Sequence, residues 1–384
     1  MRWFSVMILG IDASRANHEH KTGVEWYSFH IIEALKRVVP KDVHVRLYAD
    51  TKLSGPLGDL PDNWTEKVLS WPPRRLWTHL RLSTEMVQSP PDVLFVPAHV
   101  PPLIHPPRTV MTVHDVAAAR FPETYSAFER RYSLAAARYA VRRLWRIVTP
   151  SEFTKKELLD LFAERRADSL QPDRDNIFVV PHGYDRRYDM PGAQTEIRRV
   201  LSVYGIYPPY LLSVGRLERK KNTVATVRAF TQIQDRLPGE NLHLVLVGSP
   251  GYGYEEVVSA IAESPYRDRI ATPGWVGAEN LAALYQGAAA VLFPSLYEGF
   301  GLPLLEAMAS GTPVIAGAGS SLEEVGGAAA LYVAPGDPAA LCAAGVRLLT
   351  DAAFNRLCRE RGLAHARQFS WDRAARHTWQ VLAA

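Results

Sequence analysis

The segment FPSLYEGFGLPLLEAMASG (residues 293–311) places two carboxylates around a short glycine-rich turn, with Glu298 before the turn and Glu306 after it. An apolar run of strand type precedes the turn, and a helical pattern follows it. Gly299 and Gly301 allow the backbone to approach a ligand closely. The free N–H groups at the start of the helix favour an anion such as a phosphate. The segment therefore predicts a phosphate-binding turn between a strand and a helix.

The two carboxylates are suited to hydroxyl groups on either side of that phosphate. Glu306 lies about 7 Å along the axis from the start of the predicted helix. A carboxylate only accepts hydrogen bonds, so Glu306 fits a vicinal diol such as a ribose, and Glu298 fits the hydroxyls of a second sugar. The alternative is a solvent-facing helix with two incidental glutamates. The pattern predicts a nucleoside diphosphate sugar, held by Glu298, Gly299, Phe300, Gly301, Leu302 and Glu306.

A second segment, LLSVGRLERKKNTVATVRAF (residues 211–230), reads as strand, glycine, basic turn and helix. Arg216 follows the strand, and Lys221 stands at the start of the helix. Two cations there would neutralise a departing diphosphate, with arginine as a planar fork and lysine as a point charge. The alternative is a solvated charge run made by Arg219, Lys220 and Lys221.

Apolar strands alternate with helical stretches along the whole chain, and the rhythm restarts near residue 208. This pattern predicts an α/β protein with two doubly wound, Rossmann-like domains built on parallel sheets, the strand ends of which face a shared cleft. A length of 384 residues also favours two domains. A polar start and the pair Pro208-Pro209 predict a linker. The expected segments are an N-terminal domain at 1–189, a linker at 190–207, a C-terminal domain at 208–367, and a terminal helix at 368–384 that crosses back to the N-terminal domain in one alternative.

The composition excludes several classes of protein. The chain is 47% hydrophobic and 22% charged, as in ordinary globular proteins, and no apolar run approaches the roughly 18 residues of a membrane span. A net charge of +4 is too small for the basic footprint of a nucleic-acid-binding protein. Two cysteines make no disulfide framework and fit a reducing compartment, so a cytoplasmic location is expected.

A basic and aromatic run, ERRYSLAAARYAVRRLWR (residues 129–146), is expected to form a half-buried helix with a solvated arginine face. The alternative is contact with a lipid-linked acceptor at a membrane surface, because Tyr, Trp and Arg suit that interface. In that case the protein would be peripheral at the inner face of the membrane, attached through its N-terminal domain.

The C-terminal half, from VGRLERKKN to ALYVAPGD, resembles the retaining glycosyltransferases of family four, which have the GT-B fold. Glu298 and Glu306 match the paired glutamates of that family, with seven residues between them. Arg216 and Lys221 match its phosphate-binding arginine and lysine. The N-terminal half is also similar, in GIDASRANHEHKTGVEWYSFHIIEAL, TPSEFTKKEL and VVPHGYD. The nearest likeness is to bacterial mannosyltransferase-like members that assemble polysaccharides.

The resemblance implies roles for further residues. It assigns the acceptor to the N-terminal domain and the nucleotide sugar to the C-terminal domain. Gly23 matches a glycine whose backbone faces the donor phosphate or the acceptor. His114 matches a histidine that points at the transferred sugar, and the alternative is a core histidine beside Asp115. The chain departs from the family at His182, where many members have asparagine, and at Asn222, where glycine is common.

The resemblance thus implies a retaining hexosyltransferase with His114, Glu298, Arg216 and Lys221 as its catalytic residues. Mannose from GDP-mannose is favoured over a UDP-sugar, with a glycan or lipid-linked sugar as acceptor. Neither a cofactor nor a metal is expected. The motif Asp173-Arg174-Asp175 is not expected to bind metal, and His99, His105 and His114 lack metal-ligand spacing. A nucleotide-sugar epimerase with a similar fold and a catalytically idle nucleotide-binding subunit are the alternatives.

Overall fold

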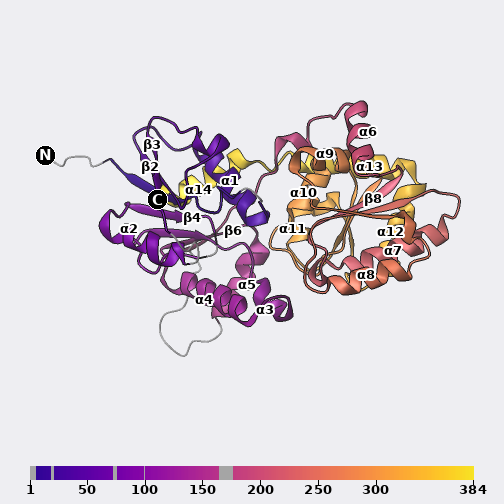
Figure 1. Cartoon of the computed structure of the whole chain (residues 1–384), viewed down its shortest axis with the longest axis horizontal. Helices are drawn as coiled ribbons and strands as arrows, with labels where there is room; N and C mark the ends of the chain where they lie inside the picture. Colours follow the sequence, from indigo (N-terminus) through magenta and orange to yellow (C-terminus); the bar gives the residue numbers. More distant parts are fainter. Residues whose placement is uncertain (1–5, 19–20, 72–75, 99, 164–175) are drawn as a thin grey trace. The chain divides into compact units, whose positions relative to one another are not determined.

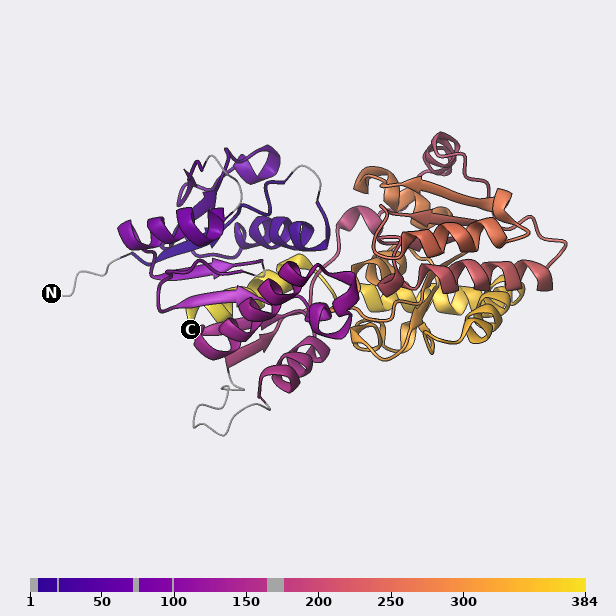
Figure 2. The ribbon, with the colours of Figure 1, turned by 60° about the horizontal axis from the view of Figure 1, so that its bottom comes forward.

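The computed structural model describes residues 6–18, 21–71, 76–98, 100–163 and 176–384. The chain forms two compact units (Figure 1), the N-terminal unit of residues 1–183 with 370–384 and the C-terminal unit of residues 184–369. Each unit contains a parallel sheet with helices on both faces (Figure 2). The predicted α/β class, with two Rossmann-like units, is therefore confirmed.

The sheet of the N-terminal unit has the order β3-β2-β1-β4-β5-β6-β7, with every neighbouring pair parallel. Its strands are β1 (Ile8–Asp12), β2 (His44–Ala49), β3 (Trp64–Val68), β4 (Val93–Val96), β5 (Thr109–Thr112), β6 (Arg146–Thr149) and β7 (Ile177–Val179). Its α-helices are α1 (Gly23–Leu35), α2 (Ser83–Gln88), α3 (Ala117–Arg120), α4 (Ala127–Arg143), α5 (Glu152–Ala163) and α14 (Trp371–Ala383), and a π-helix, η2 (Trp77–Leu82), precedes α2.

Strand β4 shows how this sheet is buried on both faces. Val93 and Phe95 pack in the core that α1 and α14 cover, whereas Leu94 and Val96 pack in the core beneath α2, α4 and α5. Successive side chains of a strand point to opposite faces, so a continuous apolar run requires such a two-sided core.

The terminal helix α14 belongs to the N-terminal unit and lies beside α1 (Figure 1). Its apolar face, which includes Trp371 and Leu382, completes the core on that side of the sheet. The helix begins against Gly183, where an added Cβ would lie 2.1 Å from the backbone nitrogen of Trp371. Glycine is therefore required at 183 by the close approach of α14.

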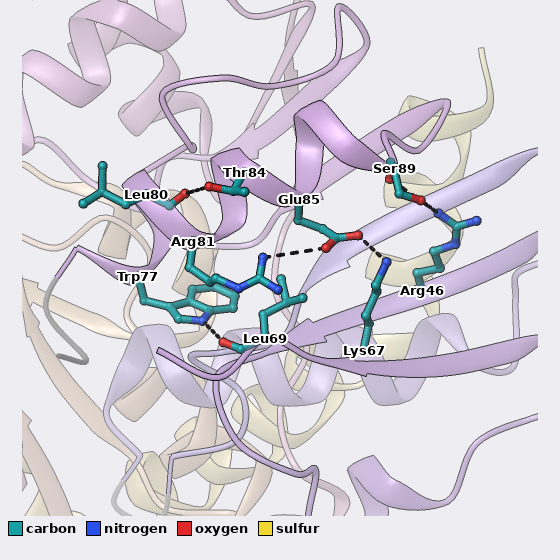
Figure 3. Close-up of polar contacts among 9 residues, drawn as sticks. All are labelled: Arg46, Lys67, Leu69, Trp77, Leu80, Arg81, Thr84, Glu85 and Ser89. Carbon is teal, nitrogen blue, oxygen red and sulfur yellow. Dashed lines mark hydrogen bonds and ion pairs between the residues drawn. The ribbon is translucent and has the colours of Figure 1, made fainter. Parts of the chain in front are cut away.

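A buried ionic cluster fixes η2 and α2 onto the sheet (Figure 3). Glu85 of α2 is 3% exposed and is ion-paired with Lys67 of β3 and, at 3.7 Å, with Arg81 of η2. The Trp77 indole donates a hydrogen bond of 2.7 Å to the carbonyl of Leu69. The ion pairs offset the free-energy cost of burying the Glu85 carboxylate, and together with the Trp77 hydrogen bond they hold the π-helix in place.

The sheet of the C-terminal unit has the order β10-β9-β8-β11-β12-β13, again with parallel neighbours. Its strands are β8 (Tyr210–Val214), β9 (His243–Val247), β10 (Ile270–Gly274), β11 (Ala290–Phe293), β12 (Val314–Gly317) and β13 (Leu331–Val333). Its α-helices are α6 (Gln194–Val203), α7 (Thr223–Arg236), α8 (Tyr254–Glu263), α9 (Ala278–Gly287), α10 (Leu302–Ala309), α11 (Ser321–Gly326), α12 (Pro338–Thr350) and α13 (Ala352–Ala366), and short 3₁₀ helices include η5 (Arg186–Tyr188) and η6 (Arg219–Lys221).

The prediction of a linker at 190–207 was wrong, because this segment contains helix α6 and belongs to the C-terminal unit. Ile197, Val200 and Leu201 of α6 are buried in the core shared with α9. Their spacing of three and four residues forms a narrow apolar face on an otherwise polar helix. The chain instead passes from the N-terminal to the C-terminal unit at 183–184.

Candidate active site

The predicted groups of the C-terminal unit lie where the strand order of its sheet reverses. The chain builds β8, β9 and β10 outward in one direction and then returns to place β11 on the other side of β8. Ligands of open α/β sheets bind beyond the carboxyl ends of strands at such a switch point. Arg216 follows β8, and Glu298 follows β11, so both lie at this edge.

Lys221 and Glu298 form an ion pair across the switch point. Both side chains are largely buried, with 19% of Lys221 and 12% of Glu298 exposed. The ammonium group also lies 5.5 Å from the centre of the Phe293 ring, and a Cβ at Gly215 would be 3.6 Å from the lysine side chain. The predicted phosphate-binding cation and the predicted sugar-binding carboxylate therefore contact each other directly.

The remaining cations of the basic turn have different surroundings. Arg216 is 65% exposed, and its Nε lies 3.6 Å from Oε2 of the buried Glu218. Arg219 is ion-paired with Glu256 of α8 on the surface, and its guanidinium lies 5.4 Å from the Tyr252 ring. The solvated charge run therefore describes Arg219 but not Lys221.

Gly301 is the N-cap of α10 and has a φ of +102°. An added Cβ would lie 2.3 Å from Cδ2 of Leu322 in α11. This glycine is therefore already required by its backbone conformation and by the packing of α11, independently of any ligand.

Phe300 is buried and its ring lies 6.1 Å from that of Phe369 in an edge-to-face arrangement. Gly299 is buried as well, and Leu302 packs against the same apolar core. The side chains of Phe300 and Leu302 therefore stabilise the turn, and the contact with the nucleotide sugar that was predicted for these residues stays a prediction for their backbone groups.

Glu306 is half-buried and accepts a hydrogen bond of 3.0 Å from the hydroxyl of Tyr285 in α9. Burial raises the pKa of Glu306 to about 7; hydrogen bonds from Tyr285 and Tyr188 lower this pKa, whereas the charge of Asp185 raises it. Burial raises the pKa of both tyrosines well above 10, so their hydroxyls stay protonated and donate. The sequence analysis identified Glu306 but missed its two tyrosine partners.

We expect nucleoside binding to weaken as the pH falls through 7, because Glu306 then gains a proton and loses the stronger, charge-assisted hydrogen bonds to a ribose. The affinity for guanosine or uridine should fall by up to about tenfold between pH 8 and pH 6, the change in ionised fraction of a group with this pKa. The measurement is calorimetry with the nucleoside. A nucleoside diphosphate is less suitable, because its terminal phosphate would itself titrate in this pH range.

Two variants separate this effect from other pH dependence. Glu306→Gln should bind the nucleoside with little change between pH 6 and pH 8. Glu306→Ala should bind it more weakly by about 2–3 kcal/mol at pH 8, the cost of losing hydrogen bonds to a charged group. A nucleoside affinity unchanged by both substitutions would contradict the ribose role.

In the N-terminal unit, Gly23 is the first residue of α1, after the N-cap Thr22. Glu25 completes a capping box with Thr22, which defines the start of the helix. An added Cβ at Gly23 would have no heavy atom within 4 Å. Gly23 is exposed, so the space beside it is open and the packing of the unit does not require a glycine there; its contact with a ligand stays a prediction.

His114 follows β5 and is 8% exposed. Its Nε2 lies 2.9 Å from the carbonyl oxygen of Pro97, and its ring is edge-to-face with Tyr27 at 4.6 Å. A carbonyl only accepts a hydrogen bond, so Nε2 carries a proton and donates it to the Pro97 oxygen. Nε2 of His114, which the resemblance expects to point at the transferred sugar, is thus engaged with the Pro97 carbonyl of its own unit.

Of the residues that were not expected to bind a metal ion, only some lie in the described part of the chain. His105 contacts the Pro106 carbonyl and the Tyr139 hydroxyl, each at 2.9 Å. His99 and the motif Asp173-Arg174-Asp175 lie outside the described residues. Among the residues that are described, no group of three or more His, Cys, Asp or Glu side chains is arranged to hold a metal ion.

Comparison with known proteins agrees with this arrangement. Residues 208–351 match the family described as Glycosyl transferases group 1, and residues 21–188 match Glycosyltransferase Family 4. The chain is 31% identical over 275 residues to the O-antigen chain mannosyltransferase B of Escherichia coli, covering 71% of this chain and 69% of that protein. It is also 31% identical to a D-inositol 3-phosphate glycosyltransferase of Nocardia farcinica, covering 71% of this chain and 59% of that protein.

Solved structures share the fold. A sucrose-phosphate synthase from Thermosynechococcus elongatus has a TM-score of 0.72 at 21% identity, covering 97% of this chain and 98% of that chain. WaaG, a glycosyltransferase involved in lipopolysaccharide biosynthesis, has a TM-score of 0.71 at 16% identity, covering 98% of both chains. With its paired carboxylates and cations at the switch point, the chain belongs to glycosyltransferase family 4 and is a hexosyltransferase of the GT-B fold.

Proposed function

We propose that the protein transfers a hexose, with mannose favoured, from a nucleoside diphosphate sugar to a hydroxyl of a glycan or lipid-linked acceptor, with retention at the anomeric carbon. The observation that carries the proposal is the pair of Lys221 and Glu298 at the switch point, with Arg216 beside it. GDP-mannose is the favoured donor because the E. coli relative is a mannosyltransferase. Bacterial polysaccharide assembly is the proposed setting.

In the proposed mechanism, the bond between sugar and phosphate breaks through an oxocarbenium-like state. Lys221, Arg216 and the N–H groups at the start of α10 stabilise the departing diphosphate, so no metal ion is needed for that role. The acceptor hydroxyl attacks from the leaving-group face, and its proton passes to a phosphate oxygen. Glu298 orients the sugar and stabilises its positive charge, and Glu306 holds the ribose.

The test is to screen GDP-mannose, UDP-glucose and related donors by thermal shift, and then to follow the sugar with and without a glycan acceptor. Transfer should depend on the acceptor, and NMR of the product should show the anomeric configuration of the donor. An altered nucleotide sugar formed without any acceptor would favour an epimerase, and a product of inverted configuration would contradict retention. Nucleotide binding without turnover would favour an idle subunit.

His114→Ala should bind GDP or UDP normally and transfer sugar at least about tenfold more slowly, a loss of roughly 1.4 kcal/mol. His114 and the nucleotide-binding groups belong to different units, so the two effects are separable. Calorimetry measures the nucleotide, and product formation measures transfer. Wild-type turnover in the variant would make His114 a core histidine, in keeping with its contacts to Pro97 and Tyr27.

We also propose peripheral contact with an anionic membrane, where a lipid-linked acceptor would be found. A patch on the N-terminal unit, here called the α4 patch, combines exposed apolar side chains with arginines. Its contacts connect α4, η2 and the loop after β4, through Tyr139 with His105 and through Tyr132 with both His79 and Phe128. The exposed residues of the α4 patch are Leu80, Leu103, Ile104, Phe128, Arg131, Arg138, Tyr139 and Arg143.

No described helix is long and apolar enough to cross a membrane. The proposed contact is therefore at the surface of the membrane, and vesicle flotation tests it. Arg131→Glu and Phe128→Ser should each weaken binding to vesicles rich in phosphatidylserine by about fivefold, close to 1 kcal/mol for a basic residue at such a surface. Val203→Ser, at an exposed apolar position of α6, is the matched control. Equal binding by all variants, or equal binding to neutral vesicles, would contradict the proposal.

A further inference from the structure

The basic turn of the C-terminal unit is joined to the loop after β11 at three consecutive positions. The carbonyl of Lys220 accepts a hydrogen bond of 2.9 Å from the backbone of Leu296, and Lys221 is ion-paired with Glu298 in the same loop. The third position is Asn222, the residue at which the chain departs from the glycine common in its family.

Asn222 has a left-handed backbone, with φ +57° and ψ +38°, between the end of η6 and the start of α7. Glycine adopts this conformation without steric cost, and asparagine is one of the few other residues that tolerate it. The conformation alone therefore explains why position 222 accepts glycine or asparagine. It does not explain the contacts of the amide group.

An asparagine at the start of a helix ordinarily caps it by accepting a hydrogen bond from the second or third backbone N–H. The Asn222 side chain makes no such cap on α7. Its Nδ2 instead donates to the carbonyl oxygens of Pro294, at 3.1 Å, and Pro335, at 2.6 Å. Both N–H bonds of the amide can thus be used, and they connect the basic turn to the ends of β11 and β13.

We propose that Asn222 is a positioning residue that holds Lys221 at the diphosphate site. The inference rests on the proposed function, in which Lys221 binds that diphosphate. Lysine is a point charge on a flexible side chain, so its use in the transition state depends on where its backbone is fixed. The amide of Asn222 fixes the next backbone position against two strand ends of the sheet.

Asn222→Gly is the informative variant, because it keeps the left-handed backbone accessible and removes only the amide. Asn222→Asp keeps the size but sets a carboxylate, which cannot donate, against two carbonyl oxygens. Lys221→Ala and the double variant Asn222→Gly/Lys221→Ala complete the set. The measurements are turnover, thermal unfolding, and calorimetry with the nucleoside and the nucleoside diphosphate of the donor found by screening.

We expect Asn222→Gly to bind the nucleoside diphosphate and to turn over about five- to tenfold less well, with unchanged nucleoside affinity, and Asn222→Asp to lose at least as much. The double variant should bind the nucleoside diphosphate and turn over no less well than Lys221→Ala alone, because the amide of Asn222 acts through the lysine. If Asn222→Gly binds and turns over normally while Lys221→Ala does not, the positioning role is wrong. An equal loss of nucleoside affinity would mean general damage and would also overturn it. Normal turnover and diphosphate binding in Lys221→Ala would instead overturn the diphosphate role that the proposed function gives to Lys221, and the positioning role with it.

Discussion

Lys221→Ala should lower turnover at saturating donor by about 10²–10³-fold, the usual cost of removing a group that stabilises developing negative charge. Charge on the diphosphate grows as the bond to the sugar breaks, so the cation helps the transition state more than the ground state. Nucleoside affinity should stay normal, because the proposed contact with the ribose is made by Glu306 and not by Lys221. Arg216→Ala should lower turnover by a smaller factor, because this side chain is 65% exposed.

Arg219→Ala is the matched control for this prediction. Arg219 is two residues before Lys221 in the same 3₁₀ turn, but its ion pair with Glu256 lies on the surface. Its removal changes the net charge equally and should leave turnover within about twofold of the wild type, as expected for a surface pair. Near-normal turnover in both Lys221→Ala and Arg216→Ala would show that the leaving group has been assigned to the wrong residues.

Glu298→Gln should change two properties in opposite directions. Turnover should fall by about 10²-fold because the positive charge of the breaking sugar bond loses its carboxylate. The nucleoside diphosphate, however, should bind about tenfold more tightly. In the protein without ligand, Glu298 is the partner of Lys221, so an entering diphosphate competes with it for the ammonium group. Glutamine is uncharged and leaves the full charge of Lys221 to the phosphate.

The double variant Glu298→Gln/Lys221→Ala decides whether this gain comes from the ion pair. If it does, the tighter binding of the diphosphate should disappear when the lysine is removed. Calorimetry with the nucleoside diphosphate gives the affinities, and the bare nucleoside serves as the internal reference. A Glu298→Gln protein that binds the diphosphate no better than the wild type would contradict the competition between carboxylate and phosphate.

The buried strands of both sheets were predictable from sequence because they are continuous apolar runs. The edge strands β3 and β10 have no such apolar run. Strand β3 has the sequence WTEKV, with most of its residues at least partly exposed, and β10 has the sequence IATPG with no fully buried residue. An edge strand has one neighbour and a solvated surface, so its composition resembles that of a loop.

The candidate site was predictable in its residue types and in its position after β8 and β11. Its internal contacts were not predictable. The partners Lys221 and Glu298 are 77 residues apart, and Tyr285 is 21 residues from Glu306. Lys221 and Glu298 meet because the ends of β8 and β11 are neighbours, and Tyr285 and Glu306 meet because α9 packs against α10. No local periodicity in the sequence records either contact. Asn222 was visible as a departure from its family, but its two carbonyl partners came only from the fold.

The place of α14 reverses the order in which the units can be completed during synthesis. The C-terminal unit is one continuous segment, residues 184–369, so all of its core has been made before α14 leaves the ribosome. The core between β1, α1 and α14 lacks Trp371 and Leu382 until the segment after residue 369 has also been made. Domains usually fold in the order of their synthesis. Here strand β1 waits for helix α14 to complete its core, and the C-terminal unit is the first of the two that can finish folding.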